Sequence, residues 1–518
     1  MNCQLCLMVI FSLSYFSSLI SVEPLSKQPL SVISEEAPCA FVNNTVNVVS
    51  GAFSLQMRHL TVPGHVPLDL VQYYNSKSSY TPWLGCGMSL NYCFSMVGND
   101  DNQKSHDKHD KYEQLIAESP GGSIIRCLGK SSTNSKTYYY LDPAVIHEGF
   151  TNCGSGNISA RTNLKNVRLK EKVKYQHGAW RAFWTCHMPD GSKRKHYGAQ
   201  NRHDPMNVLS EKRLDGTRLE FDYYKRIKLD GVIKQITAKA KSTLNWLKFE
   251  SNLHSKKATI TASNGKKATF SYFKRDDENC IYKIDSSDNP TVEFRYDRAG
   301  KHYCINKVLW PEGRFLEIEY DSKGRVVAQK VPIGGSDEKH TIWSFKYYDD
   351  KTKAYDANGN KKVFYHKNGR ITSIQEYANN APYRSKAYYW GAKSGLSWAK
   401  HPKTLEGNLM GHAVLNEEGC GTSLCYYEYD DFGNITKETT CGNLTGRYPW
   451  AFWINDNGCP KDTNVEKYHK FYKYNAEHLL THSSEDAGPS YEYRYIAGKD
   501  LPWAKFMKDG DAIILREF

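Results

Sequence analysis

FRYDRAGK (residues 294–301) and IEYDSKGRVV (residues 318–327) contain the same short pattern: tyrosine, aspartate, two variable residues and glycine. The strict pattern occurs four times in the 518 residues, where composition alone would give about 0.15 occurrences. A fifth copy, YHKNG, has His366 in place of the aspartate. The copies are Tyr296, Asp297 and Gly300; Tyr320, Asp321 and Gly324; Tyr355, Asp356 and Gly359; Tyr429, Asp430 and Gly433; and Tyr365 and Gly369. The strict copies start 24, 35 and 74 residues apart, so the chain contains a repeat of loose period.

Each copy has the residue types of a strand followed by a turn. Val292, Phe294 and Tyr296 alternate with Glu293 and Arg295, which gives a strand one apolar and one polar face. An aspartate at the start of a turn accepts backbone hydrogen bonds, and a glycine three residues later tolerates a positive φ. The pattern therefore predicts a β-hairpin in each unit.

Hairpins of this kind are marginal alone and have to be combined. Units placed side by side bury a continuous apolar face only if the sheet curls. We therefore predict an all-β fold: a long, continuous, curled antiparallel sheet of hairpins that forms a partial or closed β shell, with an additional N-terminal β region.

Composition and charge agree with this fold class and argue against nucleic acid as a partner. Hydrophobic residues make up 40% of the chain, which includes 36 tyrosines, and tyrosine favours half-exposed strands. The net charge is +13, but the lysines are scattered through every segment. Scattered lysines favour a soluble basic surface, and attraction to anionic sugars or lipid is the alternative.

The start of the chain is typical of an exported protein. The first 21 residues contain no charged side chain and resemble a secretory signal, and their apolar run is shorter than the roughly 20 residues of a membrane span. No basic residue precedes the run, so an uncleaved anchor stays open. No later stretch is apolar enough to span a membrane. We predict a signal at 1–21, a polar leader at 22–45, an N-terminal β region at 46–205 with a flexible insertion near 99–113, and the repeat sheet at 206–518.

Cysteine and histidine patterns do not predict a reactive site. Of 14 cysteines, Cys3 and Cys6 fall in the signal, which leaves 12 that permit disulfides in an exported protein, with no pairing readable from sequence. The last four cysteines, between residues 420 and 459, lack the spacing of a compact zinc site.

Two further pairs were considered as sites. His106 and His109 lie in a run polar enough to be a solvated loop, with a metal site as the alternative. Cys186 and His187 are neighbours in a predicted strand and point to opposite faces, which opposes a nucleophile–base pair. We therefore predict no catalytic residues, no metal and no cofactor.

At this point the sequence resembles a known family. Tyr-Asp-x-x-Gly at irregular spacing is similar to the Rhs/YD-repeat proteins, whose relatives include teneurins and the shell components of insecticidal toxin complexes. Residues 48–92 resemble the segment that precedes the repeats in bacterial members. The matching residues are Gly51 and Phe53, the strand 63–70, the turn Tyr74-Asn75-Ser76, and Gly85 and Gly87. Gln72 and Met88 depart from the pattern, where a basic residue and a tryptophan are usual.

The resemblance implies a hollow β shell, secreted or at a bacterial cell surface, that encloses or displays a toxin or other polypeptide cargo. Members usually continue into a self-cleaving junction and a toxic domain, whereas this sequence ends on residues 511–518, which read as an opening strand. A truncated, a split and a shell-only member all fit this ending.

Two functions of different classes follow. The first is a non-enzymatic scaffold that encloses or displays polypeptide cargo. The alternative is a surface adhesin that recognises glycans or a host protein through exposed aromatic residues, for which PWLG at 82–85 and RYPWAFWI at 447–454 are candidates. The sequence gives the identity of neither cargo nor receptor.

Overall fold

The computed structural model describes residues 40–517 with gaps, of which the longest are 78–83, 100–113, 142–150, 159–167, 198–205, 225–231 and 391–408. Side chains are described mainly in 40–92 and 192–509. The described residues form strands, turns and loops and contain no helix, as the predicted all-β class requires. It follows that no helix in this part of the chain is long and apolar enough to cross a membrane. The predicted signal, most of the predicted leader, and His106 and His109 lie outside the described residues.

Two small sheets begin the chain. In the first, β1 (Phe41–Val42) pairs with β2 (Val46–Asn47). In the second, β3 (Ser54–Val62), β4 (Leu68–Asn75) and β5 (Met88–Leu90) pair antiparallel in that order. We refer to residues 40–92, which contain both small sheets, as the N-terminal segment.

A ring of backbone pairings follows. β6 to β9 pair in sequence, β9 pairs with β12, β12 to β15 pair in sequence, and β15 pairs back with β6. The predicted boundary at residues 205/206 falls between β14 and β15, which pair with each other. The strands are β6 (Ser95–Asn99), β7 (Gln114–Ser119), β8 (Ser123–Thr133), β9 (Lys136–Leu141), β12 (Arg168–Gln176), β13 (Ala179–His187), β14 (Lys193–Tyr197) and β15 (Met206–Lys212), with the short β10 (Thr151–Asn152) and β11 (Asn157–Ile158) beside β8.

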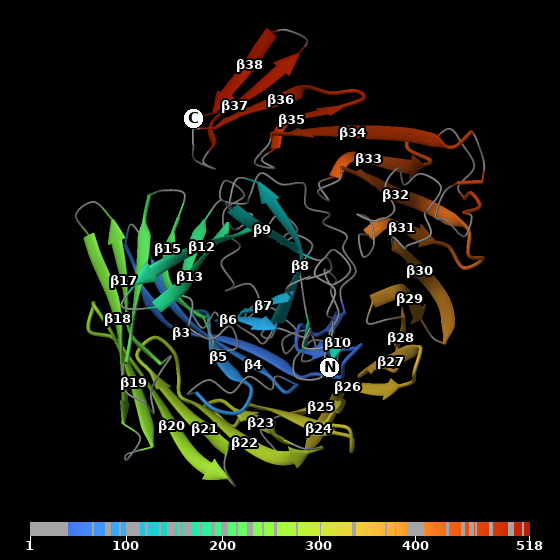
Figure 1. Cartoon of the computed structure of the whole chain (residues 1–518). Helices are drawn as coiled ribbons and strands as arrows, with labels where there is room; N and C mark the ends of the chain where they lie inside the picture. Colours follow the sequence, from blue (N-terminus) through green and yellow to red (C-terminus); the bar gives the residue numbers. More distant parts are fainter. Residues whose placement is uncertain are drawn as a thin grey trace, which may run out of the picture.

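β15 joins this ring to the long part of the sheet. Met206 and Asn207 pair with β6, whereas Ser210 to Lys212 pair with β16. From there to β38 every strand pairs antiparallel with its neighbour in sequence, a run of 24 strands from β15 that curls around β3 to β9 without closing (Figure 1). The predicted continuous curled sheet is therefore confirmed. Of the two predicted forms, a partial and a closed shell, the sheet has the partial one.

The bounds of the strands after β15 are β16 (Arg218–Tyr223), β17 (Ile233–Ala240), β18 (Thr243–Asn252), β19 (Lys257–Ala262), β20 (Lys267–Arg275), β21 (Glu278–Ser286), β22 (Val292–Ala299), β23 (His302–Leu309), β24 (Phe315–Tyr320), β25 (Val326–Pro332), β26 (Lys339–Tyr347), β27 (Lys351–Asp356), β28 (Lys361–Lys367), β29 (Arg370–Ala378), β30 (Ala381–Trp390), β31 (Leu409–Leu415), β32 (Gly421–Tyr429), β33 (Ile435–Gly442), β34 (Glu466–Tyr474), β35 (Leu480–Glu485), β36 (Ser490–Tyr495), β37 (Pro502–Asp509) and β38 (Ala512–Glu517).

Alternation along the strands gives the sheet its two faces. In β22 the side chains of Val292, Phe294 and Tyr296 are buried while Glu293 and Arg295 are exposed, as the sequence predicts. The buried face is the concave one, because it packs against the N-terminal segment, and the other face is convex. Burying one such side chain contributes about 1.5–3 kcal/mol, so the alternation itself drives the curling.

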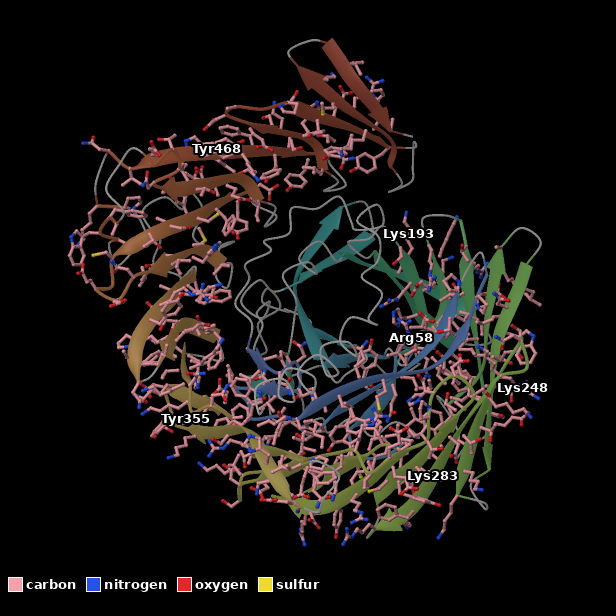
Figure 2. All side chains as sticks on the ribbon, turned by 180° about the vertical axis from the view of Figure 1, so that it is seen from behind. Arg58, Lys193, Lys248, Lys283, Tyr355 and Tyr468 are labelled. Carbon is pink, nitrogen blue, oxygen red and sulfur yellow. The ribbon has the colours of Figure 1, made fainter. Side chains whose placement is uncertain are left out.

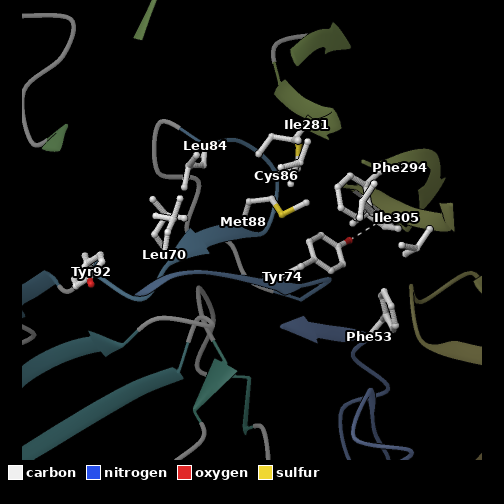
Figure 3. Close-up of a cluster of buried hydrophobic side chains, with 14 of the residues drawn as sticks. Phe53, Leu70, Tyr74, Leu84, Cys86, Met88, Tyr92, Ile281, Phe294 and Ile305 are labelled. Atoms are coloured by element: carbon white, nitrogen blue, oxygen red, sulfur yellow. Dashed lines mark hydrogen bonds between the residues drawn. The ribbon is translucent and has the colours of Figure 1, made fainter. Parts of the chain in front are cut away.

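The N-terminal segment lies against the concave face, inside the arc (Figure 1). Its largest side chains are fully buried: Phe53, Leu60, Leu68, Leu70, Leu84, Met88 and Leu90. They pack with Ile281, Phe294 and Ile305 of the sheet in a single core cluster (Figure 3). The main hydrophobic core of the described residues is therefore the interface between the segment and the sheet.

Candidate functional site

Two of the predicted turns have the expected hydrogen bonds. The Asp321 carboxylate accepts from the backbone N–H groups of Lys323 and Arg325, both at 2.9 Å. The N–H of Gly324 donates to the Asp321 carbonyl at 2.9 Å, and the φ of Gly324 is +69°. Asp356 and Gly359 repeat this geometry, with Asp356 accepting from the N–H groups of residues 358 and 360.

The turn after Tyr296 is built differently. Asp297 lies in a strand, opposite Cys304, and its carboxylate accepts from the Asn306 side chain at 2.6 Å. The reason is that β22 continues to Ala299, so the chain reverses around Gly300, whose φ is +68°. The aspartate of this copy therefore does not cap its turn, contrary to the sequence interpretation. Gly369 and Gly433 lie outside the described residues, and the importance of all these turn residues for the fold remains a prediction.

Sequence reasoning missed a turn of the same type. Asn416 accepts from the backbone N–H groups of Glu418 and Cys420 at 3.1 and 2.8 Å, and Gly419 has a φ of +82°. Asparagine offers the same acceptor oxygen as aspartate. The turn would have been found by allowing asparagine at the second position of the pattern and an apolar residue, here Leu415, at the first.

The tyrosine of the repeat has a role that the hairpin interpretation did not include. The Tyr320 hydroxyl donates at 2.8 Å to the backbone carbonyl of Ile305, and Ile305 lies opposite Tyr296 at a β-bulge. The Tyr296 hydroxyl donates at 2.8 Å to the carbonyl of Ile281, which lies opposite Tyr272 at the preceding bulge. Each ring thus joins its own hairpin to the hairpin before it.

This arrangement continues along the sheet as an aromatic ladder. Its members and the carbonyls to which they donate are Tyr223 to Val208 at 2.7 Å, Tyr296 to Ile281 at 2.8 Å, Tyr320 to Ile305 at 2.8 Å, Tyr347 to Val326 at 2.7 Å, Trp390 to Ile371 at 2.8 Å, Tyr429 to Leu409 at 2.5 Å, Tyr474 to Ile435 at 2.9 Å and Tyr495 to Leu480 at 2.7 Å. Burial raises the pKa of Tyr296 and Tyr320 well above the usual range, so both hydroxyls stay protonated donors. A side-chain donor is needed at these positions, which explains tyrosine or, at residue 390, tryptophan in place of phenylalanine.

Two predicted tyrosines are not members of the ladder. Tyr355 opposes Ser344 and Lys361, and Tyr365 opposes Lys351 and Ser373, all on the convex face. In the degenerate copy the residue at the bulge is His366, which lies opposite Ile371. Its Nε2 is buried without a hydrogen-bond partner in the described structure, and burial lowers its pKa.

The N-terminal segment covers only part of the concave face. Polar contacts tie it to the sheet from β18 to β27: the Asn245 amide donates to the Pro63 carbonyl at 3.3 Å, the backbone N–H of Ile305 donates to the Tyr74 hydroxyl at 2.9 Å, and the Thr352 hydroxyl donates to the Val48 carbonyl at 2.6 Å. The backbone N–H of Cys86 donates to the Asn279 carbonyl at 2.9 Å. We call this the covered half.

On the other side of the arc many of the concave side chains are half-exposed, although Cys425 and Tyr427 of β32 are buried. In β34, Tyr468, Lys470 and Tyr472 alternate with convex residues and are intermediate in burial. The Tyr468 hydroxyl donates to the Glu485 carboxylate, and the Tyr472 hydroxyl lies 3.5 Å from Glu438. Tyr468 is labelled on this part of the sheet in Figure 2. We call the concave side of β32 to β37 the open half.

The chemistry of the open half is that of a contact surface. Burial and the nearby Glu438 raise the pKa of the Cys425 thiol to about 12, so it is protonated at neutral pH and a poor nucleophile. Within the described residues no three histidine, cysteine or acidic side chains gather as metal ligands. Elsewhere, the thiols of Cys86 and Cys280 lie 3.4 Å apart and link the N-terminal segment to β21.

Comparison with known proteins supports the sequence interpretation. Residues 43–113 match a domain of unknown function (DUF6531), which is found in Rhs/YD-repeat proteins. No curated protein sequence matches the chain. The match confirms that the chain is Rhs-like, as residues 48–92 indicated.

Several solved structures are similar to the chain. A TcdB2–TccC3–Cdc42 complex is 11% identical with a TM-score of 0.37, over 86% of this chain and 26% of that one. TcdB2–TccC3 without its hypervariable C-terminal region is 10% identical with a TM-score of 0.37, over 88% and 27%. The N-terminal domain of the effector protein SpvB from Salmonella typhimurium strain LT2 is 11% identical with a TM-score of 0.23, over 60% and 100%. The chain thus spans about a quarter of the TcdB2–TccC3 chains that it matches.

Proposed function

We propose that this Rhs-like chain is an exported, non-enzymatic scaffold whose concave face holds a polypeptide in an extended form. One observation carries the proposal: the sheet already holds polypeptide in β conformation, its own N-terminal segment, on that face. The open half is then the place where a second polypeptide, the cargo, would lie.

The covered half illustrates how such a face recognises backbone. Thr352 donates to the carbonyl of Val48, and the Asn289 amide donates to the carbonyl of Arg58 at 2.7 Å. These bonds use main-chain groups of the segment, which every polypeptide has. Apolar side chains such as Phe53 fill the space between the bonds. Binding of this kind depends little on sequence.

The open half offers groups of the same kinds. Tyr468, Tyr472 and Tyr491 combine an apolar ring with a hydroxyl and are only half-buried. Rings of this type contribute large contact area at low cost in side-chain entropy. Lys470 lies opposite Glu438 on one neighbouring strand and opposite Glu485 on the other, and its ammonium group is a positively charged donor beside these two carboxylates. The surface therefore suits a chain of mixed sequence.

The experiment is site-specific photocrosslinking of the full chain. Tyr472 on the open half and the 40%-exposed Tyr282 of β21, which belongs to neither proposed binding surface, are each replaced by p-benzoylphenylalanine, and the protein is irradiated with a reduced, carboxymethylated and therefore unfolded polypeptide. The proposal predicts crosslinks at position 472 several times more abundant than at position 282. Equal crosslinking, or an excess at position 282, would overturn it.

Export is a separate part of the proposal and rests on the predicted signal at 1–21. Expression in a bacterium followed by N-terminal sequencing of the extracellular fraction tests it. The expected product starts near residue 22, and a protein confined to the cytoplasm would contradict export without bearing on the concave face.

A further inference from the structure

The convex face of β26 to β29 carries an unusual combination of side chains. Its register places lysines and tyrosines side by side: Lys346 lies opposite Lys353, Lys351 opposite Tyr365, and Lys361 between Tyr355 and Tyr377. We call this set, together with the 45%-exposed Tyr348 at the end of β26, the tyrosine–lysine face. The proposed function uses the other side of the sheet, so nothing above explains this face.

Each lysine lies over an aromatic ring. The ammonium of Lys361 is 3.8 Å from the ring centroid of Tyr377, and that of Lys346 is 5.9 Å from Tyr355. Lys351 and Lys353 share the ring of Tyr348, at 5.8 and 5.3 Å. Cation–π contacts at exposed sites contribute only about 0.5–1 kcal/mol, and they leave the charge of each lysine uncompensated.

Carboxylates are scarce on this face. The ammonium of Lys351 is 3.8 Å from Asp350 at the turn, and within the described residues Lys346, Lys353 and Lys361 form no ion pair. Three convex lysines elsewhere on the sheet, in contrast, are paired: Lys239 with Glu220 at 2.6 Å, Lys248 with Glu250 at 2.7 Å and Lys283 with Asp285 at 3.2 Å. Lys248 and Lys283 lie on the outer side of the arc (Figure 2).

Opposed lysines indicate that an anion belongs on this face. Like charges directly opposite each other on antiparallel strands destabilise the pair, and Lys346 and Lys353 are directly opposed. A carboxylate or sulfate placed between them would relieve the repulsion and pair with both. Because four lysines lie on neighbouring strands about 4.8 Å apart, a polymer with repeated anionic groups fits better than a single anion.

Polar groups between the lysines favour a polysaccharide. The Tyr365 and Tyr377 hydroxyls converge on the Gln375 side-chain oxygen, at 3.3 and 3.0 Å, so hydroxyl and amide groups lie at the centre of the face. Sugar hydroxyls bind to such groups. Single-stranded nucleic acid needs bare rings on which bases stack, whereas the Tyr377 and Tyr348 rings are already covered by ammonium groups.

We propose that the tyrosine–lysine face is a binding site for an acidic polysaccharide, one that carries carboxylate or sulfate groups on successive sugars. The lysines pair with the anionic groups, and the tyrosine hydroxyls and the glutamine amide contact the sugar hydroxyls. The chain would thus have two working surfaces, a concave one for polypeptide and a convex one for glycan.

The test compares two triple variants of the full chain with the same loss of charge. Lys346→Gln, Lys353→Gln and Lys361→Gln remove the unpaired lysines, and Lys239→Gln, Lys248→Gln and Lys283→Gln remove paired ones. Affinity at physiological salt is measured for heparin, polygalacturonate, oligothymidylate and vesicles that contain phosphatidylserine. Hydrogen exchange of β26 to β29 shows whether each variant keeps its fold.

The expected result is that the first variant loses at least tenfold in affinity for heparin or polygalacturonate while the control loses less than threefold. Tyr377→Leu, which keeps all charges, is expected to lose about threefold. Equal losses in the two triple variants would overturn the proposal, since only net charge would matter. So would tighter binding of oligothymidylate or vesicles than of either polysaccharide, or the absence of polysaccharide binding by the unsubstituted chain.

Discussion

The covered and open halves of the concave face are built on the same repeat but carry different side chains. Under the N-terminal segment the concave residues are apolar, such as Phe294 and Ile318, and are 3% and 2% exposed. On the open half they are tyrosine, lysine and glutamate, half-exposed. The aromatic ladder runs through both halves, with Tyr296 in one and Tyr474 in the other. The ladder and turns thus hold the sheet, and the concave residues vary with what lies against them.

The largest loss of stability is expected when a buried side chain that is present only in the covered half is truncated. Leu70 is fully buried in the N-terminal segment, so Leu70→Ala should lower the free energy of unfolding by about 2–5 kcal/mol. Chemical denaturation measures the change in the free energy of unfolding, and hydrogen exchange in β3, β4 and β21 locates it. Leu244→Ala is the control, since Leu244 is 57% exposed, and a change beyond about 0.5 kcal/mol there would contradict the assignment of the core.

Alanine substitution of two turn glycines, Gly324 and Gly359, should lower stability by different amounts. Gly324 and Gly359 both have positive φ, but an added Cβ at Gly324 would lie 3.0 Å from the Ala299 carbonyl oxygen, whereas at Gly359 it would meet nothing within 4 Å. We expect Gly324→Ala to cost about 2 kcal/mol and Gly359→Ala about 1 kcal/mol. Thermal and denaturant melts of the two variants measure these losses of stability. Equal losses would show that the close contact at Gly324 adds nothing to the strain of its backbone conformation.

Acid should weaken the covered half first. Burial lowers the pKa of His59 from 6.5 to about 4, because the neutral ring lies in the core and donates to Gln72 at 2.8 Å. The unfolded chain binds a proton below pH 6.5 while the folded chain does not, so stability is complete above pH 6.5 and falls below it. Between pH 7.5 and 5 the loss should be about 2 kcal/mol.

His59→Gln should abolish this part of the pH dependence, measured by denaturation at each pH. Leu244→Ala, at a 57%-exposed position without a titratable side chain, provides the control and should leave the profile unchanged. A wild-type profile that is flat from pH 7.5 to 5 would contradict the burial of His59.

The smallest expected difference in stability is between removing a hydroxyl of the ladder and removing the hydroxyl of a convex tyrosine. Tyr296→Phe leaves the Ile281 carbonyl without its buried donor and should cost about 1–2 kcal/mol. Tyr355→Phe removes a convex hydroxyl and should change stability by less than about 0.5 kcal/mol. Equal effects, measured by denaturant melts, would show that the ladder does not stabilise the sheet.

Much of the fold could be predicted from the sequence, because hairpin turns and strand alternation are local properties. The alternation around Tyr296 and the turn geometry of Asp321 both follow from neighbouring residues. The ladder could not be predicted, since it depends on the face on which each ring lies and on the carbonyls that the neighbouring strands bring within reach. Tyr355 and Tyr365 match the pattern but lie on the convex face, whereas Trp390 does not match and is a member.

The candidate sites depend on contacts between residues far apart in the sequence, so less of them could be predicted from the sequence. The residues of the N-terminal segment resemble a known family, but nothing in them shows that they lie on the concave face of strands more than 180 residues away. The tyrosine–lysine face required the register of four strands. The glycan hypothesis drawn from the sequence rested on isolated motifs such as RYPWAFWI at 447–454, whereas the polysaccharide site that we propose lies on β26 to β29.

The account depends on the concave face holding the N-terminal segment, and the Cys86 and Cys280 thiols, 3.4 Å apart, report on it directly. The measurement is peptide mapping by mass spectrometry after oxidation of the native chain with oxidised glutathione, with Cys280→Ser as the control. Thiols this close join with little backbone movement. The account predicts a Cys86–Cys280 crosslink as the main product involving either residue. Linkage of Cys86 to another cysteine, or its alkylation as fast as in the unfolded chain, would contradict it.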